Sequence, residues 1–424
     1  MDEPELFRQG GFRLAARART AKADAAQVAR LREFAQQEDA LADAVVEWLH
    51  QQDNRHGKSQ DNGRPGAKRP SSDPNDLVDR VLAGRTTPDL PPALRAFRDQ
   101  TEATPYWVDP VRLDRGARAI TRAGLLGLFP LGDMSLMGGY LASRATKSLV
   151  GTGEIEHRAP RRLVETAAWW IDVTTPGALV RHGTGYQAAL RIRLVHAQVR
   201  RAMNRRPDWD YERWDRPVNQ VQTAGTLLLF SLVYVFGTQL LGLRYSAREK
   251  ADILHLWRYV GWLMGVADEL LPADEDDAWR LLWLLAVTEF VPDDDSKRLA
   301  RALVDTHAAI GEGRGPLGKV LAQVNVGVHS AISRLVLGRS NADFLELPDN
   351  PVAQAAVLAA AGVNYAAETV RLLVPGATAL QEAVGAFGRR RYLARMNAVF
   401  GRAPRGRGSG AAASGPIGSI RAAQ

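Results

Sequence analysis

One histidine occupies a position from which it could bind a metal ion or a haem iron. In the predicted helix 187–204, the residues Ala189, Ile192, His196, Val199 and Met203 recur at spacings of three and four. Residues with this spacing share one helix face, and an apolar face is the buried one. His196 is therefore expected to point inward among apolar neighbours. Two interpretations stay open here: a core histidine with locally bonded ring nitrogens, or an axial ligand to iron.

Two arginines flank this histidine. Arg193 precedes His196 by three residues, and Arg200 follows it by four. Cations beside an inward imidazole suit haem, because arginine pairs with propionates through bidentate, charge-assisted hydrogen bonds. Arginines beside an apolar stripe also occur in ordinary helices, where their stems lie along apolar surface and their charged ends reach water. Arg193 is the first candidate for a propionate partner.

The remaining histidines offer weaker ligand sets. His255 lies in another apolar helix and is the main rival to His196. His307 and His329 fall in helices that carry no acidic partner at ligand spacing. The others, near loops or helix ends, are His50, His56, His157 and His182.

Glu154 and His157 match the Glu-x-x-His element of carboxylate-bridged di-iron bundles. Such a site needs two copies on facing helices, and the sequence holds one. The di-iron interpretation is therefore the weaker one.

Several other chemistries are excluded. The chain has no cysteine, which rules out a thiolate nucleophile, a zinc–cysteine site, an iron–sulfur cluster and cysteine-ligated haem. No phosphate-binding glycine loop in a βαβ context and no Gly-x-Ser-x-Gly elbow is found.

The elements that must position His196 are helices. Strand signals are nearly absent, and proline and glycine mark the ends of successive helical patterns. Helices are predicted over 160–174, 187–204, 218–242, 247–266, 276–290, 295–310, 317–338, 351–374 and 378–400. The expected organisation is an N-terminal helical segment (1–50), a disordered linker (51–75), a helical domain (76–401) and a disordered tail (402–424).

The stretch 217–243 carries no charged residue, and 227–235 is densely apolar. Its length would allow a membrane span. Polar residues are spread through it, however, which favours a helix buried on all sides in a large helical protein. Thr223 and Thr226 are then expected to face a pocket.

The formal net charge is +8. A basic surface can attract nucleic acid or an anionic membrane surface, but a solvated basic surface is the simpler interpretation. The first residues show no basic segment followed by an apolar run, so a cytoplasmic location is expected. We expect no nucleic-acid partner and no membrane span, with peripheral membrane contact left open.

Several blocks, in their order and spacing, resemble the latex-clearing (rubber) oxygenases and the wider family that includes the mycophenolic-acid pathway oxygenase. The resemblance covers roughly 114–303. The blocks are 161–166 (Arg-Arg-Leu-Val-Glu-Thr), 175–177 (Thr-Pro-Gly), 191–200 around His196, 217–220 (Pro-Val-Asn-Gln), 229–231 (Leu-Phe-Ser), 255–266 from His255 to Val266, and 269–272 (Glu-Leu-Leu-Pro).

The resemblance implies an all-α fold, a globin-like helical core enlarged by additional helices, with a b-type haem inside. The family's proximal histidine falls on His196, and its distal arginine and threonine fall on Arg162 and Thr166. Glu165 stands where rubber oxygenases carry a lysine, and a carboxylate there could act as a general base. Glu154 is a candidate for the family's separate catalytic glutamate.

The expected activity is that of a haem b-dependent oxygenase. It would use dioxygen on an apolar, isoprenoid-like small molecule and cleave a carbon–carbon double bond oxidatively. Thr223, Thr226 and Arg258 join Arg193 as candidate cofactor contacts. Two alternatives are a non-catalytic haem-binding sensor or carrier, and a helical interaction protein without a cofactor.

Overall fold

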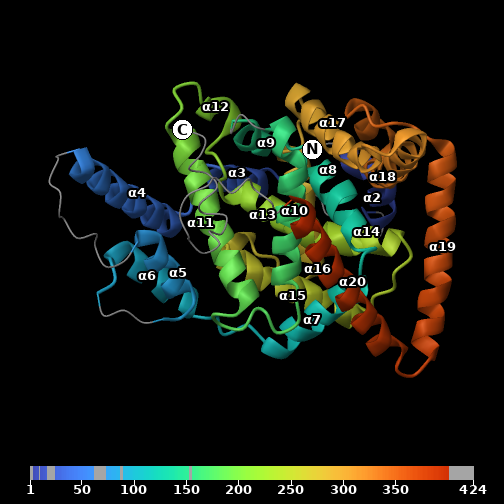
Figure 1. Ribbon diagram of the computed structural model, residues 1–424, viewed down its shortest axis with the longest axis horizontal. Helices are drawn as coiled ribbons and strands as arrows, with labels where there is room; N and C mark the ends of the chain where they lie inside the picture. The colour runs from blue at the N-terminus through green and yellow to red at the C-terminus, as the bar shows by residue number, and fades with distance from the viewer. Residues whose placement is uncertain are drawn as a thin grey trace.

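A computed structural model describes residues 3–8, 10–16, 24–61, 73–85, 89–151 and 155–400. These residues form helices joined by short connections, and no strand occurs among them. The prediction of an all-α fold is confirmed. Figure 1 shows α10, α11, α13, α15 and α16 in the middle of the molecule, with α4, α5 and α6 at one end and α19 at the other.

The helices fall into three consecutive groups along the chain. The first group is α1 (Glu5–Arg8), α2 (Gly10–Ala16), α3 (Ala25–Phe34), α4 (Ala40–Asp61), α5 (Pro74–Leu82), α6 (Pro92–Glu102) and α7 (Pro110–Arg122). The second is η1 (Pro130–Leu136), α8 (Met137–Gly139), α9 (Ser143–Val150), α10 (Ile155–Val173), α11 (Thr184–Asn204), α12 (Tyr211–Trp214), α13 (Gln220–Leu228), η2 (Leu229–Val233) and α14 (Tyr234–Leu240). The third is α15 (Ala247–Leu263), η3 (Asp268–Leu270), α16 (Glu275–Thr288), α17 (Asp294–Ala308), η4 (Ala309–Gly311), α18 (Gly315–Phe344), α19 (Pro351–Leu373) and α20 (Ala377–Phe400).

The predicted linker begins too early. Helix α4 continues to Asp61, so residues 51–61 are helical, and α5 begins at Pro74. Once the apolar residues of 40–50 have started a helix, each further residue adds one hydrogen bond, and polar residues with good helix propensity extend it. Residues 62–72 and the predicted tail 402–424 lie outside the described residues.

The predicted helix 218–242 has an irregular centre. Its two α-helical parts, α13 and α14, are joined by η2, a π-helical segment. A second π-helix, η1, packs against it, and the Ser135 hydroxyl of η1 donates a hydrogen bond to the Leu229 carbonyl oxygen at 2.5 Å. A side chain at Gly237 would clash with the Met134 sulfur, at 2.1 Å from an added Cβ. The two π segments therefore pack closely.

Among the described residues, two helical stretches have the length and apolar composition of a membrane span: 220–240 and α18. The first is 72% buried inside the protein, which agrees with the predicted buried helix. Helix α18 is 39% buried, and its first half exposes Leu317, Val320 and Val324.

Charged groups join the N-terminal segment to the central helix α11. The Arg193 guanidinium donates to both oxygens of Asp39 at 2.6 and 2.9 Å, and both side chains are buried. Asp39 also accepts from the backbone N–H of Ala42 in the first turn of α4. Two turns further along α11, Arg200 donates to Asp43 at 2.8 Å. Helix α11 is thus pinned to α4 along one face.

Helix α20 is fixed to the other side of the core by Arg389. This buried guanidinium donates to the hydroxyls of Thr121 and Thr174 and to the Ile171 carbonyl oxygen. Burial lowers its pKa to about 10. The three oxygens that accept hydrogen bonds from Arg389 are all uncharged. The buried guanidinium thus connects α20 to α7 and to the end of α10.

Asp39→Asn should destabilise the protein by about 3–5 kcal/mol, because it leaves the buried Arg193 charge without its counter-ion. Denaturant unfolding followed by far-UV circular dichroism measures the change. Asp208→Asn is the matched control: it breaks an exposed pair with Arg206 and should cost less than about 1 kcal/mol. Equal losses in the two variants would contradict the anchoring role.

Candidate functional site

His196 lies on α11 between Arg193 and Arg200, about one turn from each, so the three residues share one side of the helix. Burial, and secondarily the nearby Arg200 charge, lower its pKa to about 4, while Asp39 opposes the shift. The imidazole is therefore neutral at neutral pH, which is the form that binds a metal. Within the described part of the chain, no group hydrogen-bonds either ring nitrogen.

The stripe of α11 that carries His196 is only partly buried. Its ring lies deep enough for burial to depress its pKa, yet the side chain is only half-buried. Its stripe neighbours Ile192 and Val199 are half-buried too, whereas Leu194 and Ala197 on other faces are fully buried. These three side chains therefore form a partly accessible stripe along α11. Helix α10 packs against α11.

The three predicted catalytic residues of α10 divide between two faces. Arg162 and Thr166 are one turn apart and half-buried. Glu165 is exposed, with half of its side-chain surface accessible, and accepts a hydrogen bond from Arg161 at 2.8 Å. The structure therefore brings Arg162 and Thr166 together and places Glu165 apart, in a solvent-side ion pair.

Tyr140 belongs with Arg162 and was missed by sequence reasoning. Burial raises the pKa of its hydroxyl, and the Arg162 charge opposes that shift, so the two side chains are near each other. Tyr140 is half-buried. No local pattern marked it, because it follows the short helix α8 and its partner comes from α10.

The two threonines of α13 have an unusual setting. Thr223 is half-buried and Thr226 is exposed, although the surrounding helix is apolar and mostly interior. Their hydroxyls donate to the carbonyl oxygens of Asn219 and Gln222, one turn earlier. Each oxygen keeps lone pairs that can accept a hydrogen bond. The expectation that these threonines face a pocket stays a prediction.

Arg193, which was predicted to bind a haem propionate, is bonded to protein groups instead. Its guanidinium makes four hydrogen bonds, to Asp39, Gln100 and the Leu263 carbonyl oxygen. A propionate would have to displace Asp39, so Arg193 is a structural residue. Arg258 lies over the Trp107 ring at 4.3 Å, and its Nε has no hydrogen-bond partner. It retains donors for an anionic ligand.

The rival histidine is engaged within the core. His255 is buried, its Nε2 accepts a hydrogen bond from the Asp109 backbone N–H at 3.0 Å, and its ring packs edge-on against Trp107. Burial lowers its pKa to about 4. Glu154 and the side chain of His157 lie outside the described residues, so the di-iron element and the candidate glutamate stay predictions.

A pH titration of stability tests the role of His255. Its pKa is about 4 in the folded protein against 6.5 in the unfolded chain, so the unfolded chain binds the proton first as the pH falls. Stability should therefore be lost between those two values. His255→Gln keeps an acceptor that does not titrate, and should reduce the loss of unfolding free energy between about pH 7 and about pH 5 by up to about 2 kcal/mol. Identical slopes for wild type and variant in denaturant titrations would contradict this assignment.

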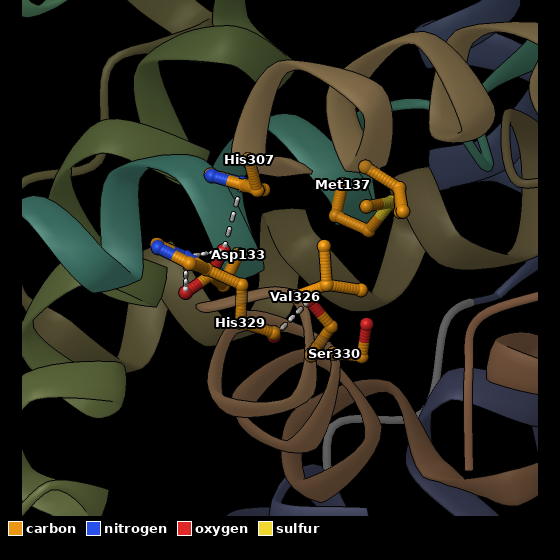
Figure 2. A pocket seen from close by; sticks show the side chains of 8 residues that line it. Asp133, Met137, His307, Val326, His329 and Ser330 are labelled. Atoms are coloured by element: carbon orange, nitrogen blue, oxygen red, sulfur yellow. Dashed lines mark hydrogen bonds and ion pairs between the residues drawn. The ribbon is translucent and has the colours of Figure 1, made fainter. Parts of the chain in front are cut away.

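Sequence reasoning also missed a cluster of His307, His329 and Asp133. The two histidines were set aside because their own helices supply no acidic partner. The partner comes instead from η1, and the His329 ring lies 2.8 Å from a carboxylate oxygen of Asp133 (Figure 2). A local search of ligand spacing cannot find a residue that is 196 positions away.

The described residues thus form an all-helical fold whose central helix α11 carries a neutral histidine with no hydrogen-bond partner among them. The chain belongs to the family described as ER-bound oxygenase mpaB/B'/Rubber oxygenase, catalytic domain, whose model matches residues 121–371, more than half of the chain.

Two similar proteins can be compared directly. A rubber oxygenase of Streptomyces sp. (strain K30) is 26% identical over 274 residues, 62% of this chain and 62% of that protein. The solved structure of the latex clearing protein LCP in the closed state superposes with a TM-score of 0.62 at 21% identity, over 85% of this chain and 91% of that one. The sequence match thus spans under two thirds of the curated relative, while the fold is shared more widely.

Proposed function

We propose that this protein is a haem b-dependent oxygenase that uses dioxygen to cleave a carbon–carbon double bond in an apolar, isoprenoid-like molecule. The observation that carries the proposal is His196: a neutral, partly buried imidazole with no hydrogen-bond partner among the described residues. The family to which the chain belongs consists of oxygenases, and one relative is named for rubber, an isoprenoid polymer.

The residues around His196 suit a haem. Its ring offers an axial nitrogen ligand, and Ile192 and Val199 beside it supply apolar wall. Arg258 keeps donors for an acidic group. A haem b bound there would supply an iron centre that activates dioxygen.

The protein's own groups would set the polarity of the reaction space. Arg162 and Thr166 present a guanidinium and a hydroxyl from one face of α10, and such donors stabilise negative charge that develops as dioxygen is reduced. Thr223 and Thr226 add acceptor oxygens from α13. The uncharged helix 220–240 supplies a dry wall, which favours an apolar substrate over a charged one.

His196→Ala should abolish or strongly shift the Soret absorption of the purified protein, because it removes the axial ligand. The matched control is His255→Gln, which changes a histidine of similar depth that already accepts a backbone hydrogen bond; its Soret band should be retained. The measurement is an absorption spectrum of each protein after haem addition. A wild-type protein that stays colourless would overturn the proposal and favour a helical interaction protein.

Thr166→Val should lower substrate-dependent oxygen consumption by about 10²-fold while haem content is kept, since it removes one donor without changing side-chain shape. Glu165→Gln is the neighbouring control, and its rate should stay close to wild type because Glu165 lies in an exposed pair with Arg161. An oxygen electrode with apolar terpenoids as substrates provides the rates. A large loss of oxygen consumption in Glu165→Gln, with none in Thr166→Val, would contradict the proposal that Thr166 faces the substrate and Glu165 faces solvent.

A further inference from the structure

Asp133, His307 and His329 form a cluster in which the carboxylate is buried and the two histidines are partly buried. Their ligand-type atoms all lie within 4.8 Å of one another. The His329 Nδ1 is 2.8 Å from one Asp133 oxygen and 2.9 Å from the other, and the His307 Nε2 is 3.6 Å from Asp133. Figure 2 shows both rings directed at the carboxylate, with Met137, Val326 and Ser330 around them.

Hydrogen bonding within the cluster leaves one nitrogen unsatisfied. The His307 Nε2 is buried and has no hydrogen-bond partner, and the side chain of His307 is only 10% exposed. Its ring stacks on the His329 ring at 3.6 Å with an interplanar angle of 11°. A buried polar atom without a partner is costly unless something else occupies its lone pair or proton.

The ligand chemistry matches a divalent first-row transition ion. Two imidazole nitrogens and one carboxylate oxygen are typical of zinc and its neighbours, whereas calcium and magnesium prefer oxygen alone. Bonds of about 2.0–2.1 Å at tetrahedral angles place ligand atoms roughly 3.3 Å apart. The separations of 2.8, 2.9 and 3.6 Å lie on both sides of that value, so small side-chain shifts admit an ion.

We propose that Asp133, His307 and His329 bind a divalent transition-metal ion of the zinc class, separate from the haem site. The ion would join three elements, because the ligands come from η1, α17 and α18. Asp133 contributes from a π-helix, a geometry that recurs at functional sites. Ser135 in the same segment bonds to Leu229 of η2, so the ion would also steady the buried helix that carries Thr223 and Thr226.

Zinc content is the first test, since zinc is distinguished from haem iron by elemental mass spectrometry. The full-length, haem-loaded protein, purified without chelator, should hold one zinc ion per chain after exposure to zinc and desalting. Asp133→Asn and His307→Gln, which change the ligand atoms with little change in size, should each weaken zinc binding by at least about tenfold. His182→Gln, at a partly exposed histidine outside the cluster, should bind zinc as the wild type does.

The His196→Ala variant separates this proposal from the haem proposal: it should lose haem and keep zinc. X-ray absorption at the zinc edge of the wild-type protein gives a result that does not depend on how well any variant folds. A first shell of nitrogen and oxygen with imidazole scattering is expected. Absence of retained zinc in the wild type, a shell without imidazole, or equal zinc binding in Asp133→Asn, His307→Gln and wild type would overturn the proposal.

Discussion

The buried ion pair between Arg193 and Asp39 is the constraint on which the arrangement of the core depends. Two opposite charges in a dry interior are stable only while each has the other, so the pair fixes α11 against the start of α4. His196 lies on the same side of α11, about one turn from Arg193 and from Arg200. One helix thereby carries both the arginines that hold α4 and the histidine of the proposed haem site.

The ion pair also shows that the family-matching part is not self-contained. Asp39 precedes the matched range of 121–371, and Arg389, which closes the opposite side of the core, follows it. Each residue supplies a buried partner to the matched part. A fragment cut at the matched boundaries would leave Arg193 charged and unpaired, and would remove the helix that covers Trp170.

Sequence reasoning recovered what depends on local periodicity. Most helices from α10 to α20 were predicted close to their observed bounds, because an apolar pattern ended by proline or glycine marks them. The short helix α12 was not predicted, and α18 continues to Phe344, beyond the predicted end at 338. The inward position of His196 follows from the same periodicity. Partners from distant segments could not be predicted. Arg193 was assigned to a propionate because its actual partner, Asp39, lies 154 residues away in the sequence and no local pattern connects the two. The solvent side of Glu165 depends on the phase of α10 against its neighbours, which the sequence leaves undefined.

The π segments escaped prediction for a related reason. In 227–235 nearly every residue is apolar, so no face is marked and the number of residues in a turn cannot be inferred. The structure resolves this through packing, since η1 and η2 contact each other and their irregular turns coincide. The candidate metal cluster and the threonines of α13 lie on the two sides of this contact.

The π turn of η2 constrains the number of residues in Leu229–Val233 more tightly than it constrains which apolar residues they are. A π turn holds about one residue more than an α-helical turn, so removing one residue from Leu229–Val233 would restore a regular α-helix, while Tyr234 and Thr238 would keep nearly the same facing toward Trp170 and the core. The loss would fall on the wide turn itself, where the Leu229 carbonyl oxygen accepts the hydrogen bond from Ser135 of η1. One apolar residue can replace another here with modest repacking, whereas a deletion would remove the turn that packs against η1. This segment should therefore drift by substitution over evolutionary time while its residue count stays constant.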